Sequence, residues 1–264
     1  MRLGFIGCGN MAGAMIGGIL EHGICSASDI IASTLHQESA DQVRETYGIE
    51  ATVDNRRVAR ECGILILAVK PQFYEEVIEE IREDVSDDTI IVSIAPGKTL
   101  EWLDIQFGRP MKLVRCMPNT PALVGEGITG VCCNEEVEEE ELNRICQILS
   151  GCGKTEVLSE HLIDVVVSVS GSSPAYVFMF IEAMADAAVA DGMPRAQAYK
   201  FASQAILGSA KMVLETGKHP GELKDMVCSP GGTTIEAVRV LEERGFRSAV
   251  IEAMKACTRK AKGM

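Results

Sequence analysis

The sequence predicts an α/β protein in which a doubly wound sheet is followed by an all-α segment. A glycine-rich loop, Gly7–Ala12, comes directly after the first apolar run. Short apolar runs then alternate with helical segments as far as residue 155, and from about residue 161 only helical patterns follow. Alternating strands and helices are typical of a parallel sheet with helices on both faces. We therefore expect a Rossmann-like dinucleotide-binding domain over residues 1–160 and a helical domain over residues 161–264.

The predicted strands are short runs that are nearly continuous in apolar residues, as strands buried on both faces must be. They are Arg2–Gly7, Asp29–Ser33, Ile64–Val69, Thr89–Ser93, Lys112–Met117 and Gly127–Cys133. Between them the sequence predicts helices at Met11–His22, Gln37–Tyr47 and Gln72–Asp84.

The helical part begins with an unusually apolar segment, Ser173–Asp191. We expect Ser173 to cap this helix, Pro174 to occupy its first turn and Gly192 to end it. Its apolar residues cover most of the circumference, so the helix needs burial on nearly all sides. A module of about 100 residues favours a second subunit as part of that burial, although a single-chain bundle is the alternative. Further helices are predicted at Arg195–Thr216, Thr234–Glu243 and Ser248–Lys260.

Composition excludes several classes of function. Lys plus Arg is 25 and Asp plus Glu is 38, which gives a net charge of −13 and argues against nucleic acid or membrane as a partner. The first apolar run breaks at Gly7, too early for a signal peptide. The ten cysteines have neither CxxC nor zinc-site spacing. We expect reduced thiols, no metal and a cytoplasmic location.

The loop Gly7–Ala12 reads GCGNMA, a G-x-G-x-x-A pattern that opens a helix after a strand. The first glycine permits a tight turn, the second lets the backbone approach a pyrophosphate, and Ala12 allows close helix–strand packing. Cys8 is small enough for the loop, and a redox-sensing role is the alternative. The residues expected to contact the cofactor here are Gly7, Gly9, Asn10, Met11 and Ala12.

The end of the next strand indicates which nicotinamide cofactor is preferred. An NAD enzyme usually has an acidic residue there to bind the ribose hydroxyls. This strand ends with Ser33 and Thr34, so no carboxylate repels a 2′-phosphate and two hydroxyls are available to it. NADPH is therefore expected, with NADH as the alternative.

Four motifs then carry a resemblance to the pyrroline-5-carboxylate reductase family, over essentially the whole chain. They are the segments 68–72 (AVKPQ), 115–121 (RCMPNTP), 171–176 (GSSPAY) and 228–237 (CSPGGTTIEA). Ser173 departs from the family, which usually has glycine at that place.

The resemblance implies a cofactor site, a substrate site and an assembly. Further cofactor contacts fall on Asn55, Ala68, Val69, Lys70, Pro71 and Ala95. The substrate carboxylate is assigned to the glycine turn, and Thr234 is assigned the hydrogen bond to the ring nitrogen. Asn119 is expected to orient the substrate, or else to be a turn residue. The family also implies a homodimer through the helical domain, which can build a decamer.

The residues of the glycine turn support a carboxylate site on physical grounds. Gly231 and Gly232 keep side chains away from the start of a helix, where free N–H groups attract anions. Thr233 and Glu236 have capping-box spacing, which predicts that Thr233 caps the helix and Thr234 is its first residue. The substrate-binding residues expected are Ser229, Gly231, Gly232, Thr233, Thr234 and Asn119.

The expected reaction is hydride transfer to the C=N bond of 1-pyrroline-5-carboxylate, which gives L-proline. A protonated imine is electrophilic without a metal, so the enzyme needs mainly to position the two reactants. This accounts for the absence of histidine from all of these motifs. The alternatives are a reductase of a six-membered or other related cyclic imino acid and a non-catalytic NADP-binding protein. A β-hydroxyacid dehydrogenase is disfavoured because no lysine follows Gly171–Ser173.

Overall fold

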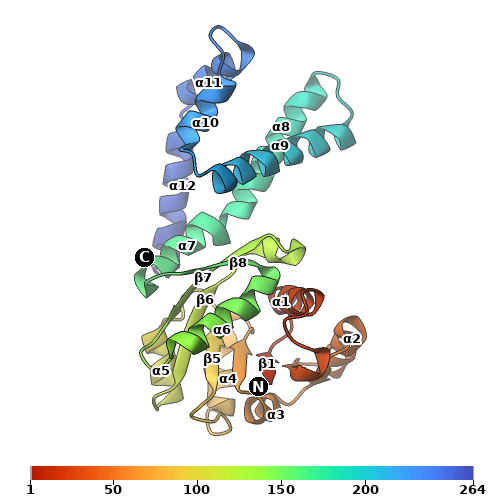
Figure 1. Ribbon diagram of the computed structural model, residues 1–264, viewed down its shortest axis with the longest axis vertical. Coiled ribbons are helices and arrows are strands. Elements are labelled where there is room, and N and C mark those ends of the chain that lie inside the picture. The colour runs from red at the N-terminus through yellow and green to blue at the C-terminus, as the bar shows by residue number, and fades with distance from the viewer. Residues whose placement is uncertain (1, 264) are drawn as a thin grey trace. The chain divides into compact units, whose positions relative to one another are not determined.

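The computed structural model describes residues 2–263, which form two compact units (Figure 1). The first unit contains the chain up to Ser172 together with the segment from Cys257 onward, and the second is Ser173–Ala256. The chain thus leaves the first unit inside one helical stretch and returns to it inside the last helix. The sequence places the domain boundary at residue 160, whereas these units divide at Ser172.

The first unit is built on an eight-stranded sheet with the order β3-β2-β1-β4-β5-β6-β7-β8. The strands are β1 (Leu3–Ile6), β2 (Ile30–Ser33), β3 (Glu50–Thr52), β4 (Ile64–Leu67), β5 (Ile90–Ser93), β6 (Lys112–Met117), β7 (Gly127–Cys133) and β8 (Gly153–Val157). All six predicted strands are present, and the predicted fold class is confirmed. The sequence missed β3 and β8, which are polar and lie at the two ends of the sheet.

The direction of the strands decides where ligands bind. β1 to β6 are mutually parallel, while β7 is antiparallel to β6. The strand order reverses between β1 and β4, whose residues pair in register from Leu3↔Ile64 to Ile6↔Leu67. Loops that follow parallel strands meet at one edge of the sheet, and ligands bind where the order reverses. We call the edge at which β1, β2, β4, β5 and β6 end the ligand edge.

Helices cover both faces of the sheet and create two hydrophobic cores. One face carries α1 (Asn10–Glu21), α2 (Gln37–Tyr47) and α6 (Glu139–Leu149). The other carries α3 (Asn55–Glu61), α4 (Tyr74–Ile81), α5 (Leu100–Phe107) and the short α7 (Ile163–Val166). The predicted helix Gln72–Asp84 is a 3₁₀ turn, η2 (Pro71–Phe73), followed by α4. The sequence missed α3, α5 and α6.

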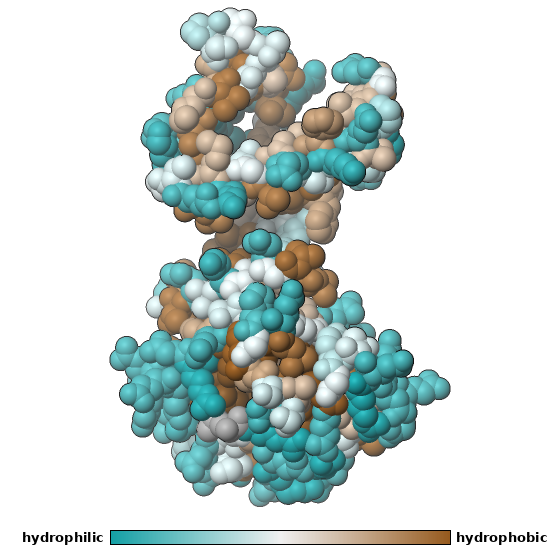
Figure 2. Space-filling model, turned by 45° about the vertical axis from the view of Figure 1, so that its right-hand side comes forward, coloured by the Kyte–Doolittle hydropathy of each residue, from teal (hydrophilic) through white to brown (hydrophobic). Residues whose placement is uncertain are grey.

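The second unit consists of helices that bury little of their apolar surface. They are α8 (Ser173–Ala190), α9 (Arg195–Thr216), α10 (Pro220–Val227), α11 (Thr233–Glu243) and most of α12 (Phe246–Ala261). Only Ala185 of α8 is buried, whereas Phe178 and Met179 are 63% and 68% exposed. Figure 2 shows apolar residues on the surface of these helices. The structure thus agrees with the expectation that this module needs a partner to cover it.

One helical stretch in this region, Glu160–Ala190, is long and apolar enough to cross a membrane by length and composition alone. Only 11% of its most apolar window is buried in the chain. A helix that packs against another subunit has the same properties, because both environments exclude water.

The contact between α1 and the loop at Gly151 gives a test of the packing. A side chain at Gly18 would place its Cβ 2.2 Å from the carbonyl oxygen of Gly151, so two backbones would have to separate. We expect Gly18→Ala to lower the free energy of unfolding by about 1–3 kcal/mol, measured by urea denaturation.

Gly17→Ala is the matched control, because its Cβ would meet only Tyr47 Cε1 at 3.8 Å. Alanine is the better helix former by about 1 kcal/mol, so Gly17→Ala should be neutral or stabilising. Equal effects of the two substitutions would contradict the close α1–Gly151 contact.

Candidate active site

The loop between β1 and α1 has the geometry of a phosphate site. Gly7 has φ +88, and a Cβ there would lie 2.9 Å from the backbone nitrogen of Val69. Gly9 is the N-cap of α1 without a side-chain hydrogen bond, so the first amides of α1 are not capped by a side chain. A Cβ on Gly9 would meet nothing within 4 Å, and Ala12 is buried. The open N-terminus of α1 therefore fits a pyrophosphate.

A groove of about 930 Å³ opens from this loop and runs along the outer side of α1. Gly13 and Gly17 of α1, Tyr47 of α2 and Leu123 are among the residues that line it. Cys8 lies at its phosphate-loop end, where burial raises the pKa of the thiol to about 11. A thiol that stays protonated at neutral pH is a poor redox sensor, so the structure argues against that role for Cys8.

At the end of β2 the two hydroxyl groups expected to contact a 2′-phosphate have partners inside the protein. Ser33 is fully buried, and its hydroxyl donates to Asn55 Oδ1 at 2.7 Å. Thr34 is also buried and donates to the carbonyl oxygen of His36 at 3.0 Å. Both hydroxyl protons are thus used inside the protein, and each hydroxyl would have to give up this partner to donate to a 2′-phosphate. Their contact with the cofactor stays a prediction.

The same network includes Glu80, which the sequence did not indicate. Asn55, the first residue of α3, donates from Nδ2 to Glu80 Oε2 at 2.8 Å. Glu80 lies on α4, 25 residues further along the chain. Asn55 thus remains at the ligand edge with a fixed amide orientation, because Ser33 and Glu80 bind its two ends.

The segments after β4 and β5 also reach the ligand edge. The amide of Ala68 donates to the Ile6 carbonyl at 2.8 Å, which places Val69 against Gly7. Lys70 is exposed, and Pro71 begins the turn η2. Ala95, which follows β5, is buried. The residues predicted after these two strands therefore lie along the same edge as the phosphate loop.

Asn119 follows β6 and is buried, with both ends of its amide bound to backbone. Its Oδ1 accepts the amide of Ile128 at 2.9 Å, and its Nδ2 donates to the carbonyl of Ser170 at 3.1 Å. A direct contact with substrate, as expected from the resemblance, does not agree with this bonding.

Arg115, in the same motif, is a buried cation that the sequence did not single out. Its Nη1 lies 3.0 Å from Glu160 Oε1 and its Nη2 lies 3.1 Å from Asp164 Oδ1. Glu160 also accepts the amide of Leu100 at 2.7 Å. A buried guanidinium without a partner is costly, so Arg115 fixes α7 and the start of α5 on the sheet through these two partly exposed carboxylates.

In the second unit, the glycine turn has a well-defined local geometry. The amide of Gly232 donates to the Ser229 carbonyl at 3.0 Å, and Gly231 has φ +67. Proline at the second place and a positive-φ glycine at the third are typical of a type II turn. A Cβ on Gly232 would lie 2.4 Å from Ser229 Oγ and 3.2 Å from the Ser229 carbonyl oxygen, so a side chain there would displace the Ser229 hydroxyl.

The helix after this turn starts one residue earlier than predicted. Gly232 is the N-cap of α11, and Thr233 and Thr234 are its first two residues. The predicted capping box is wrong, because Glu236 pairs with Arg239 instead. Since Gly232 has no side chain to cap α11, the first amides of the helix stay open to an anion.

Comparisons with known proteins identify the family of the chain. A family model for pyrroline-5-carboxylate reductase dimerisation matches residues 160–264, and one for NADP oxidoreductase, coenzyme F420-dependent, matches residues 2–97. The chain is 54% identical to the pyrroline-5-carboxylate reductase of Escherichia coli K12, over 98% of this chain and 97% of that protein.

The chain belongs to the pyrroline-5-carboxylate reductase family.

Solved structures of the family have the same fold. The enzyme from Coxiella burnetii matches with a TM-score of 0.93 at 34% identity, over 99% of this chain and 97% of that one. The Plasmodium falciparum enzyme, solved with NADP bound, matches with a TM-score of 0.91 at 32% identity, over 100% and 97%. The match to the family's dimerisation model explains the apolar surface of the second unit and supports a homo-oligomer.

Ser173, where members of this reductase family usually have glycine, is itself the first residue of α8. It therefore lies inside the helix, and the prediction that it caps the helix is wrong.

The open space at Gly9 gives a test of the phosphate site. We expect Gly9→Ala to fold normally, because the methyl group meets no protein atom within 4 Å. The same methyl group would block the approach of a pyrophosphate, so NADPH affinity should fall by about tenfold or more. Isothermal titration calorimetry measures the affinity, and thermal unfolding checks that the variant is folded. Unchanged affinity in Gly9→Ala would remove the loop from the cofactor site.

Proposed function

We propose that this protein reduces 1-pyrroline-5-carboxylate to L-proline with NADPH, the last step of proline synthesis. Full-length membership of the reductase family carries this proposal. The two anion-binding helix starts support it: α1 suits a dinucleotide and α11 suits the carboxylate of a small substrate.

The chain's own residues provide binding and orientation. The amides at the start of α1 would hold the pyrophosphate, and Asn55, Val69, Lys70 and Ala95 would line the rest of the cofactor. When bound, NADPH supplies the hydride for the C=N bond. The amides at the start of α11 would bind the substrate carboxylate, and the Thr234 hydroxyl oxygen would accept a hydrogen bond from the protonated ring nitrogen. Such positioning supplies most of the catalysis, because a protonated imine is already electrophilic.

The direct test is the loss of NADPH absorbance with pyrroline-5-carboxylate, run beside the six-membered imine and a hydroxyacid with NADP. We expect turnover with the five-membered imine. Faster turnover of the six-membered ring would change the assigned substrate. No turnover with any of the three, while NADPH still binds, would favour a non-catalytic NADP-binding protein.

Thr234 gives a sharper test of the substrate site. Thr234→Ala removes a hydrogen bond to a charged ring nitrogen, a loss of about 1.5–3 kcal/mol, and should lower kcat/KM for the imino acid about 10- to 100-fold. Thr234→Ser keeps the hydroxyl and should restore most of the activity. NADPH affinity should be the same in both variants. Unchanged steady-state kinetics in Thr234→Ala would remove this residue from the mechanism.

We also propose a cytoplasmic homodimer formed through the helical second unit, with a decamer as its higher assembly. The exposed apolar side chains of α8 support an interface there, because surfaces of this kind are usually covered by a partner.

A charge on that surface should dissociate the oligomer. We expect Phe178→Glu to lower the molar mass measured by light scattering to that of a single chain, because an unpaired carboxylate is costly in an apolar interface. Ile105→Glu is the control, since Ile105 is equally exposed, at 67%, but lies on α5 of the first unit. An unchanged mass for Phe178→Glu would place the interface elsewhere.

A further inference from the structure

The helical stretch that begins near Glu160 contains one turn of π-helix. Between α7 and α8 the residues Val167–Gly171 are π-helical, and the amide of Ser172 donates to the Val167 carbonyl at 2.8 Å. Single π-turns inside α-helices are uncommon and are frequent at functional sites. We call residues 167–171 the π-turn.

Local side chains stabilise the π-turn. The Ser168 hydroxyl donates to the Val165 carbonyl at 2.9 Å, and the Ser170 hydroxyl donates to the Val166 carbonyl at 3.2 Å. These serines reach back to carbonyl groups at the widened turn, which otherwise lose good helical partners. A Cβ on Gly171 would lie 3.0 Å from Met117 Cε, so the end of the π-turn packs directly on the last residue of β6.

Asn119 supplies a hydrogen bond that the helix itself cannot make. In an α-helix the Ser170 carbonyl would accept the amide of residue 174, but that residue is Pro174, which has no N–H. Asn119 Nδ2 donates to this carbonyl instead, while Asn119 Oδ1 accepts the amide of Ile128 on β7. The buried amide thus joins the π-turn to the ligand edge of the sheet.

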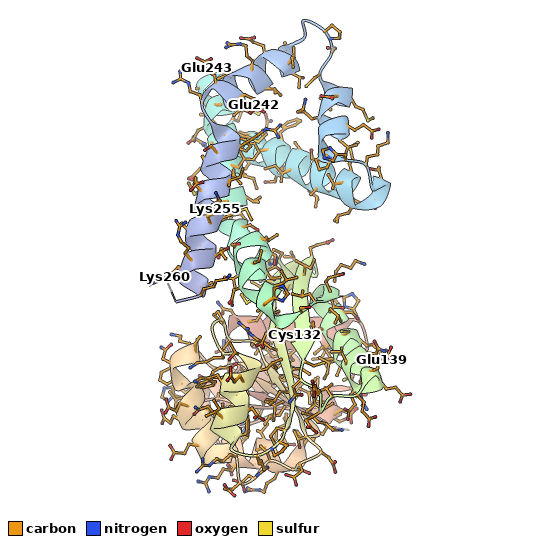
Figure 3. The ribbon with its side chains drawn as sticks, turned by 90° about the vertical axis from the view of Figure 1, so that its left-hand side faces the viewer. Cys132, Glu139, Glu242, Glu243, Lys255 and Lys260 are labelled. Atoms are coloured by element: carbon orange, nitrogen blue, oxygen red, sulfur yellow. The ribbon has the colours of Figure 1, made fainter. Side chains whose placement is uncertain are left out.

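The end of α12 holds the π-turn from another side. Thr258 Oγ1 donates to Ser168 Oγ at 2.9 Å, and Ser168 is only 1% exposed. Cys257 Sγ donates to Ser172 Oγ at 3.2 Å. Lys255 and Lys260, labelled in Figure 3, lie on α12 on either side of these two residues. All of these contacts are within the first unit.

We propose that Asn119 is a positioning residue, which acts through the π-turn and holds residues 168–173 at the ligand edge. The inference rests on the proposed function. The π-turn packs on the end of β6, at the edge that carries the phosphate loop, and leads directly into the family motif 171–176. A shift of this segment would change how the imino acid is placed for hydride transfer. It would leave NADPH binding intact, because the phosphate loop follows a different strand.

The test compares two asparagines that have the same kind of bonding at opposite edges of the sheet. Asn134 Oδ1 accepts the amide of Leu113 at 3.0 Å, and its Nδ2 donates to the Met111 carbonyl at 2.8 Å. Asn119→Asp and Asn134→Asp each keep the acceptor and lose the donor to a carbonyl. Asn134 lies where β6 begins, away from the ligand edge.

For Asn119→Asp we expect kcat/KM for pyrroline-5-carboxylate to fall by about tenfold or more, mainly through kcat, since small misplacements of a substrate are costly. NADPH affinity should stay within about twofold of wild type. Hydrogen exchange should be faster at residues 168–173. Asn134→Asp should lose as much thermal stability as Asn119→Asp but should keep the wild-type kcat. Equal kinetics for the two variants, with wild type active, would overturn the inference.

An inactive wild-type protein would instead overturn the proposed function, and hydrogen exchange at residues 168–173 would then decide the inference alone. If Asn119→Asp does not fold, Thr258→Val is the second variant, because it removes the hydrogen bond from α12 to Ser168 in the π-turn. It should lower kcat about 3- to 10-fold, the usual value of one hydrogen bond, and Thr258→Ser should restore it. A stability loss with unchanged kcat in Thr258→Val would count against the π-turn as a positioning element.

Discussion

The contact between the ends of β1 and β4 is the constraint on which the rest of this structure depends. Gly7 has positive φ and presses against the Val69 amide, so no side chain fits between the two strands. This contact turns the chain into α1 exactly where the strand order of the sheet reverses. The first amides of α1, the segment after β4 and the start of the groove along α1 are placed together as a result.

The two faces of the sheet are held by different kinds of interaction. On the α1 side the packing depends on small residues, and Gly18 and Gly151 bring two backbones into direct contact. On the α7 side a buried cation, Arg115, binds two carboxylates at the start of the long helical stretch. Because a buried charge without partners is costly, this arrangement specifies one position for α7 on β6, and with it the position of the π-turn.

The second unit is a different kind of structure, because its core is incomplete in one chain. Its helices leave large side chains such as Phe178 and Met179 exposed. The family's dimerisation model covers this part of the chain, which supports association with another subunit as the means of covering these side chains. Length and composition alone do not distinguish such a helix from a membrane span, and only the relationship to a dimerising family decides between them.

The sequence by itself determined the fold class, the six apolar strands and the glycine turns, because these depend on local patterns: apolar runs, and glycine where φ is positive or backbones meet. It did not determine which polar side chains are free. Ser33, Thr34 and Asn119 look available in the sequence but are bonded to residues far along the chain or to backbone. Glu80, Arg115 and Thr258 gain their roles only from partners brought close by folding. Hydrogen-bond partners are set by tertiary contacts, which no local pattern records.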